Sequence, residues 1–198
     1  MPDGIPDDAE QAVIAANGVK GLLTCALRPH LIWGPGDPHL VPRLLDLARQ
    51  GKLRRIGDGT NLIDVVFVEN AALAHVLAGD ALFRGSPVCG SVYFISQGEP
   101  VHCWEWINEI LAMADVPPVT KAVSLKTAWR VGRVLETVYG MLRLRKEPPM
   151  TRFLATQLAK SHYFDIRGAR NHFGYQPRVS MAEGMARLSE EISVKSAG

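Results

Sequence analysis

The chain has 198 residues, of which 47% are hydrophobic and 21% are charged, and its formal net charge is +2. This composition is typical of a globular protein with its own core and argues against disorder. The small charge, without any run of five basic residues, argues against a nucleic-acid partner.

Cysteine usage and the N-terminal residues bear on the cellular location. The three cysteines lack Cys-x-x-Cys spacing, so they support neither a disulfide framework nor a metal site. Asp3, Asp7 and Asp8 stand where a signal peptide would carry a basic and then an apolar run. No apolar stretch of about 18 residues occurs. We therefore expect a cytoplasmic protein that does not span a membrane.

Helices and strands are expected to alternate in the first half of the chain. A helix is predicted over 7–17, ending at Asn17-Gly18. The apolar run 22–27 has the length and continuity of a parallel strand covered on both faces, which Arg28-Pro29 would end. The other elements predicted here are a helix at 40–50, strands near 54–56 and 64–68 around a turn at 57–61, a helix at 69–82 and a strand at 91–96.

The second half is predicted to be mainly helical. Apolar residues at three- and four-residue steps indicate helices at 102–115 and 125–142. Further predicted elements are a helix at 151–159, a short strand at Tyr163-Phe164, and helices at 166–173 and 180–193. Alternating elements followed by helices indicate an α/β fold with a helix-rich lobe.

Several motifs, taken in order and spacing, resemble one enzyme family. They are Leu27-Arg28-Pro29, Gly34-Pro35-Gly36-Asp37, Gly57-Asp58-Gly59-Thr60-Asn61, Val68-Glu69-Asn70 and His162-Tyr163-Phe164-Asp165-Ile166. Together they resemble the 3β-hydroxysteroid dehydrogenase-like branch of the extended short-chain dehydrogenases. The resemblance implies the C-terminal part of a doubly wound Rossmann-type parallel sheet. Residues 1–100 would supply its late strands and helices, and 101–198 a substrate-binding lobe and the C-terminal elements, as one cooperative unit.

Two motifs of that family are missing from this chain. No Gly-rich dinucleotide fingerprint occurs, and the residues four positions after the tyrosines are Gln97, Arg143, Arg167 and Val179, so no Tyr-x-x-x-Lys pair exists. In the family the helix bearing this pair runs on into a step that Ala9-Glu10 resembles. We therefore expect that the chain starts downstream of its catalytic helix and is inactive alone, and we assign no catalytic residue. Truncation, a late start codon or a gene remnant would each account for this.

The resemblance also implies which residues line the site. Arg28, Pro29, His30 and Ile32 would form part of the nicotinamide wall for NAD or NADP, and Trp33, Gly34, Asp64 and Phe67 would contact substrate. The carboxyl end of a strand is where open α/β sheets bind ligands. The plainer alternative is that Pro29 ends the strand and Arg28 pairs with a surface acid.

The substrate class follows from one departure within the superfamily. Nucleotide-sugar epimerases and dehydratases place an Arg, which can bind a diphosphate, where this chain has Ile63. A bulky lipid, either a 3β-hydroxysteroid or a 2-alkyl-3-keto acid, is therefore preferred, and similarity to 2-alkyl-3-oxoalkanoate reductases points the same way. The alternatives are a nucleotide-sugar relative and a non-catalytic lipid- or membrane-binding remnant.

The segment 121–146 carries seven basic residues and one acid, Glu136. An apolar stripe containing Trp129 and Tyr139 between such cations is typical of a helix on an anionic membrane surface, so peripheral contact through 124–143 is one expectation. The alternative is ordinary packing with a solvated basic face. A homodimer is a further expectation, because the strand at 22–27 would lack its neighbouring strands.

Overall fold

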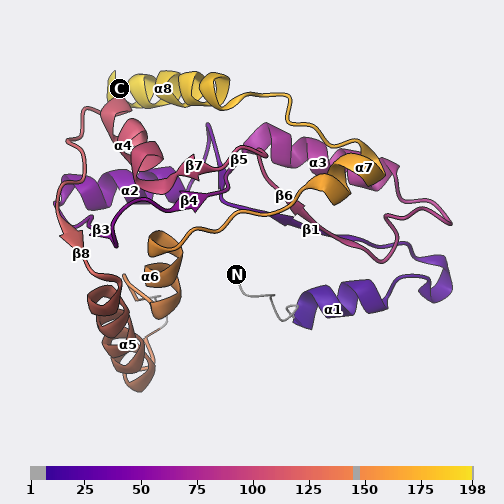
Figure 1. The fold of residues 1–198 in the computed structure, drawn as a ribbon, viewed down its shortest axis with the longest axis horizontal. Helices are drawn as coiled ribbons and strands as arrows, with labels where there is room; N and C mark the ends of the chain where they lie inside the picture. Colours follow the sequence, from indigo (N-terminus) through magenta and orange to yellow (C-terminus); the bar gives the residue numbers. More distant parts are fainter. Residues whose placement is uncertain (1–7, 145–147, 198) are drawn as a thin grey trace. The chain divides into compact units, whose positions relative to one another are not determined.

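The computed structural model describes residues 8–144 and 148–197, in which helices alternate with short strands (Figure 1). The chain divides into two compact units, each assembled from separate segments. Unit 1 comprises Met1–Gly36, Asp64–Pro100 and Tyr163–Leu188, and unit 2 comprises Asp37–Ile63, Val101–His162 and Ser189–Gly198. The division at residue 100 stays a prediction.

Unit 1 is built on two parallel strand pairs. β1 (Ala26–Pro29) pairs with β6 (Val92–Ile95), and β2 (Ile32–Trp33) pairs with β5 (Val66–Phe67). Its helices are α1 (Asp8–Ala15), the single turn η1 (Val19–Gly21), α3 (Val68–Asp80), α7 (Arg167–Phe173) and the first part of α8 (Met181–Ala197).

The core of unit 1 lies where α3 and α7 meet β6. Ala71, Ala74 and Ala78 recur at helical spacing on α3, and all three are buried in one cluster with Val66, Val88, Tyr93, Ile95, Ile166, Ala169, Phe173 and Tyr175. Small side chains at these steps let a helix lie close to a sheet. Tyr175 brings a polar group into this cluster, but its hydroxyl donates to the Ser96 carbonyl at 3.0 Å. Burial raises the pKa of Tyr175 to about 12.

The first strand differs from its prediction. It begins at Ala26 rather than at residue 22 and continues through Arg28 and Pro29, and all four residues are half-buried. The reason is the partner, because β6 begins at Val92, just after a turn at Gly90 with φ 74°. Pro29 is tolerated because Ala26 N donates to the Ser91 carbonyl and His30 N to the Ile95 carbonyl of β6. Backbone amides alternate along a strand, so the nitrogen of Pro29 faces the opposite edge.

Unit 2 is built on two further strand pairs. β3 (Arg55–Ile56) pairs in parallel with β8 (Ala122–Val123), and β4 (Leu62–Ile63) pairs antiparallel with β7 (Val101–His102). Its helices are α2 (Leu40–Arg49), α4 (Cys103–Met113), α5 (Leu125–Met141), α6 (Arg152–Ala159) and the last part of α8. Helix α4 buries six of its residues and packs against α2.

Three other expectations need correction. No strand forms at Tyr163-Phe164, and the nearest ladder contact is an isolated bridge from His162 to Ile63. The predicted strand at 64–68 is reduced to the two residues of β5, and α8 runs four residues beyond its predicted end. Strands of two residues are too short to produce a periodic pattern, which also explains why β2, β7 and β8 were not predicted.

The outer edge of β1 is expected to make the isolated chain self-associate. Within the described residues, β1 has β6 as its one strand partner. An open parallel edge offers unpaired backbone groups to another chain. Light scattering should therefore show an apparent mass that rises with protein concentration. A monodisperse monomer at all concentrations would contradict this prediction.

Cys103 is expected to be far less reactive than Cys89. Burial raises the pKa of the Cys103 thiol to about 11, whereas the Cys89 side chain is partly exposed. At pH 8 the small thiolate fraction of Cys103 should make its alkylation about 100-fold or more slower than that of Cys89. Mass spectrometry after iodoacetamide treatment would measure both rates, with guanidinium-unfolded protein as the control. Equal rates in the folded protein would contradict the burial of this side chain.

Candidate cofactor and substrate site

The carboxyl end of the β1–β6 pair brings two of the predicted residues onto one side. Arg28 and Phe94 are opposite each other in the parallel register, so their side chains lie on the same face. The Arg28 guanidinium lies over the Phe94 ring at 5.1 Å from its centroid. His30 follows two residues after Arg28, and its ring meets the edge of Phe164 at 5.0 Å between centroids. The sequence interpretation correctly placed Arg28 and His30 at one strand end.

Phe94 and Phe164 complete this face, and sequence reasoning did not assign either of them to it. Their rings stack with centroids 4.1 Å apart and an interplanar angle of 8°. Asp64 fixes the position of Phe164, because its buried carboxylate accepts the Phe164 backbone N–H at 2.8 Å. The predicted site residue Asp64 therefore orients the aromatic pair. Phe94 was missed because its position opposite Arg28 depends on the register of β1 and β6, which the sequence does not show.

Arg28 is engaged by an acid of the same unit. Its Nε and Nη2 donate to the two carboxylate oxygens of Glu10 on α1 at 2.6 and 2.7 Å. This paired hydrogen bonding raises the pKa of Arg28. The ion pair agrees with the plainer interpretation of Arg28. A contact between Arg28 and a cofactor stays a prediction.

The predicted substrate residues Trp33, Gly34 and Phe67 also come together, but as packed core. Trp33 and Phe67 are fully buried and meet edge to face at 5.3 Å. Gly34 has φ 142°, and a Cβ there would lie 2.9 Å from the Phe67 ring. Ile32, on the neighbouring position of β2, is 43% exposed. The buried pair supports the strand ends, and direct contact of these residues with substrate stays a prediction.

A buried amide network fixes the loop before α8. The Asn70 side chain donates to Gln97 Oε1 and the Val179 carbonyl at 3.1 and 2.8 Å, and it accepts the backbone N–H groups of Arg178 and Val179. Gln97 also donates to the Val179 carbonyl. Asn70 thus makes four hydrogen bonds, which an amide can satisfy fully. This explains the Asn of the Val68-Glu69-Asn70 motif in structural terms.

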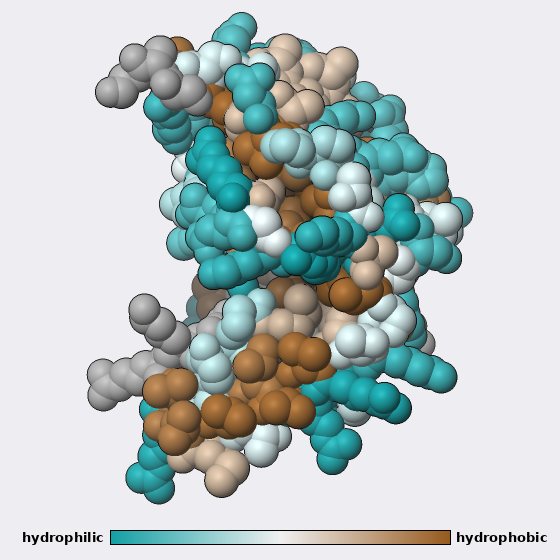
Figure 2. All heavy atoms as spheres, turned by 90° about the vertical axis from the view of Figure 1, so that its left-hand side faces the viewer, coloured by the Kyte–Doolittle hydropathy of each residue, from teal (hydrophilic) through white to brown (hydrophobic). Residues whose placement is uncertain are grey.

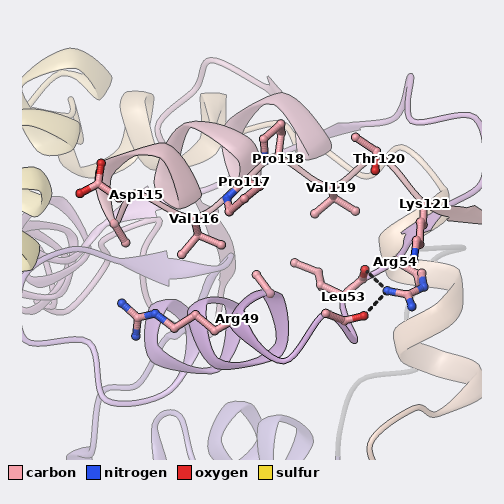
Figure 3. A pocket seen from close by; sticks show the side chains of 13 residues that line it. Arg49, Leu53, Arg54, Asp115, Val116, Pro117, Pro118, Val119, Thr120 and Lys121 are labelled. Carbon is pink, nitrogen blue, oxygen red and sulfur yellow. Dashed lines mark hydrogen bonds between the residues drawn. The ribbon is translucent and has the colours of Figure 1, made fainter.

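Two pockets, one in each unit, are lined by residues other than the predicted site residues. Figure 3 shows the pocket of unit 2, of about 510 Å³, between the end of α2 and the chain after α4, with Arg49, Arg54 and Lys121 in its wall. Arg54 donates to the Gly51 and Leu53 carbonyls, so it closes the turn after α2. A second pocket, in unit 1, includes Gln97, Arg170 and Arg178. No group of three metal-ligating side chains lies together in 8–144 or 148–197.

The residues present do not by themselves form a dinucleotide site. A pyrophosphate is normally held by a Gly-rich turn at a helix N-terminus, and this sequence lacks that motif. At the β1–β6 strand end the Arg28 charge is already paired with Glu10. Beside this strand end, the rings of His30, Phe94 and Phe164 form an aromatic face.

Comparison with known proteins supports the resemblance. Residues 6–126 match the 3-beta hydroxysteroid dehydrogenase/isomerase family. The chain belongs to this family. The family match covers α1 to the start of α5, and it therefore includes every residue that the sequence predicted for the cofactor and substrate site, whereas Phe164 lies beyond it.

Individual relatives place the chain within the family. A 2-alkyl-3-oxoalkanoate reductase of Stenotrophomonas maltophilia is 54% identical over 91% of this chain and 54% of its own length. The human sterol-4-alpha-carboxylate 3-dehydrogenase, decarboxylating, is 35% identical over 92% of this chain and 50% of its own length. The chain thus spans about half the length of these curated relatives.

A solved structure confirms the α/β fold with parallel strand pairs. MoeE5, in complex with UDP-glucuronic acid and NAD, is 25% identical and superimposes with a TM-score of 0.61. The match covers 95% of this chain and 53% of MoeE5. The oxidoreductase family assigned from the motifs is confirmed, and the cofactor and substrate of this chain are matters for proposal.

Proposed function

We propose that this chain is the substrate-side part of an NAD(P)-dependent oxidoreductase that transfers a hydride between the nicotinamide and a secondary alcohol or ketone of a bulky lipid. The observation that supports this proposal most strongly is the 54% identity to a 2-alkyl-3-oxoalkanoate reductase, compared with 35% identity to a sterol dehydrogenase. We therefore favour a 2-alkyl-3-oxoalkanoate over a 3β-hydroxysteroid as the substrate.

Position 63 lacks the Arg expected for a nucleotide-sugar substrate. Ile63 is 2% exposed in β4, where it pairs with Val101 of β7. A diphosphate needs a guanidinium or similar donor, which this position lacks. The nucleotide-sugar alternative is weakened accordingly, even though the fold is shared with enzymes that bind such substrates.

The chain's own residues would contribute orientation and water exclusion. The stacked Phe94 and Phe164 rings give a flat apolar wall beside the strand end, and Asp64 holds that wall in place. In the family the proton transfer belongs to the Tyr-x-x-x-Lys pair, which this chain lacks. A non-catalytic lipid-binding role is the second candidate, favoured by the exposed apolar face of α5.

The test is to supply the N-terminal half of a relative that carries the Tyr-x-x-x-Lys pair and the Gly-rich turn. The chain would be fused to the N-terminal half of the Stenotrophomonas maltophilia relative, joined just before α1. We expect the fusion to reduce 2-alkyl-3-oxoalkanoates with NAD(P)H and to prefer them over 3β-hydroxysteroids in kcat/KM. A fusion that folds and binds NAD(P) but turns over neither substrate would refute the proposal.

A further inference from the structure

Helix α5 has two apolar faces, of which one is used for packing. Ala128 and Gly132 are buried, and α5 packs against α6 along this side. A Cβ at Gly132 would lie 2.7 Å from the Arg152 backbone nitrogen, so the two helices approach as closely as glycine permits. Trp129, which shared the predicted stripe, has the Arg152 guanidinium over its ring at 5.6 Å. The predicted stripe therefore combined this packing face with Val138 and Leu142, which are exposed.

The second apolar face of α5 is exposed. It is formed by residues three and four positions apart, which align on one side of a helix. Their exposed fractions run from 41% to 79%, and the set is Val131, Val134, Val138, Met141 and, in the turn that follows the helix, Leu142. Figure 2 shows this face as the brown surface in its lower part. We call it the α5 apolar stripe.

A row of cations runs beside the α5 apolar stripe. Lys126, Arg130 and Arg133 are exposed and lie on the side of the stripe away from the packing face, by helical position. The single acid of the helix, Glu136, is engaged by Arg152, whose Nε donates to it at 2.6 Å. The basic row therefore has no acid on its own helix to neutralise it.

We propose that the α5 apolar stripe docks on an anionic lipid surface, with the helix lying in the membrane plane. The stripe would enter the boundary between headgroups and acyl chains, and Lys126, Arg130 and Arg133 would meet the lipid phosphates. No helix within the described residues is long and apolar enough to cross a bilayer, so attachment is peripheral. A second copy of the chain is a poorer occupant, because two basic rows would face each other.

The membrane contact refines the earlier expectation for 124–143. The residues that would enter the lipid are those of the α5 apolar stripe, whereas Tyr139 is half-buried and Trp129, which is 37% exposed, has the Arg152 guanidinium over its ring. The inference stands on the surface of unit 2 and needs no turnover. Its failure and that of the proposed reaction are therefore distinguishable.

The experiment is sedimentation of the purified chain with phosphatidylcholine vesicles that either contain or lack phosphatidylserine. We expect binding to the anionic vesicles at low ionic strength, and weaker binding at high ionic strength. Changing Arg130→Glu together with Arg133→Glu should weaken the partition by roughly 30-fold, since each lost cation contributes on the order of 1 kcal/mol. Changing Val134→Asn together with Met141→Gln should weaken it by at least about tenfold.

A matched control carries the same change of charge elsewhere on unit 2. Arg43→Glu with Lys52→Glu alters two exposed cations outside α5 and should leave binding unchanged. Circular dichroism would verify that each variant folds. Absence of binding by the unaltered chain, or equal binding by all variants, would overturn the proposal. So would a dimer that the Val134→Asn/Met141→Gln variant splits while no vesicle binding occurs, because the stripe would then be an interface between copies.

Discussion

The purified chain alone is expected to give no nicotinamide-dependent turnover with either a 2-alkyl-3-oxoalkanoate or a 3β-hydroxysteroid. Loss of a positioned acid and base costs about 10²- to 10⁴-fold in rate. This chain lacks both the Tyr-x-x-x-Lys pair and the Gly-rich turn that would hold the cofactor. The two losses of rate multiply. The absorbance of reduced nicotinamide should therefore change no faster with the chain than in buffer.

The fusion with the relative's N-terminal half provides the positive control for that experiment. A fusion in which the supplied Tyr of Tyr-x-x-x-Lys is replaced by Phe should lose activity while keeping nicotinamide binding, measured by fluorescence quenching. Robust turnover by the unaltered chain would contradict the prediction. It would mean that acid–base groups of this chain, such as His30 beside Phe164, perform the proton transfer.

Long helices were predicted well because their signals are local. The observed α2 and α4 lie within one or two residues of the predicted ranges, since apolar spacing is read directly from the sequence. The first strand was misplaced because its length depends on β6, which is more than sixty residues away in the sequence. The extent of a strand is set by its partner, and a single segment does not encode its partner.

The same distinction applies to the candidate site. Arg28 and His30 were assigned from neighbouring motif residues, whereas Phe94, Phe164 and the Glu10 partner come from three distant segments. Their meeting depends on the parallel register and on the Asp64 hydrogen bond, neither of which leaves a pattern in the sequence. The two faces of α5 were likewise merged into one stripe, because apolar spacing does not say which face α6 covers.

Asn70→Asp is expected to destabilise unit 1 strongly, although the two side chains have nearly the same shape. The amide of Asn70 donates to Gln97 Oε1 and to the Val179 carbonyl, so a carboxylate there would face two acceptor oxygens. The Arg178 and Val179 N–H groups would still donate to one carboxylate oxygen, but the other oxygen would carry buried charge against the two acceptors, which costs about 3 kcal/mol or more of unfolding free energy. Asn70→Ala should cost about 2 kcal/mol, because it also removes the acceptor of the Arg178 and Val179 N–H groups but adds no charge.

The measurement is urea unfolding followed by fluorescence, in the unaltered chain and both variants. Asn108→Asp is the matched control. The Asn108 side chain accepts the Val119 backbone N–H at 2.9 Å through Oδ1, an acceptor that aspartate keeps. We expect that variant to remain within about 1 kcal/mol of the unaltered chain. If Asn70→Asp proved as mild as Asn108→Asp, the donor role of Asn70 would be refuted, and the loop at Val179 would be held by packing alone.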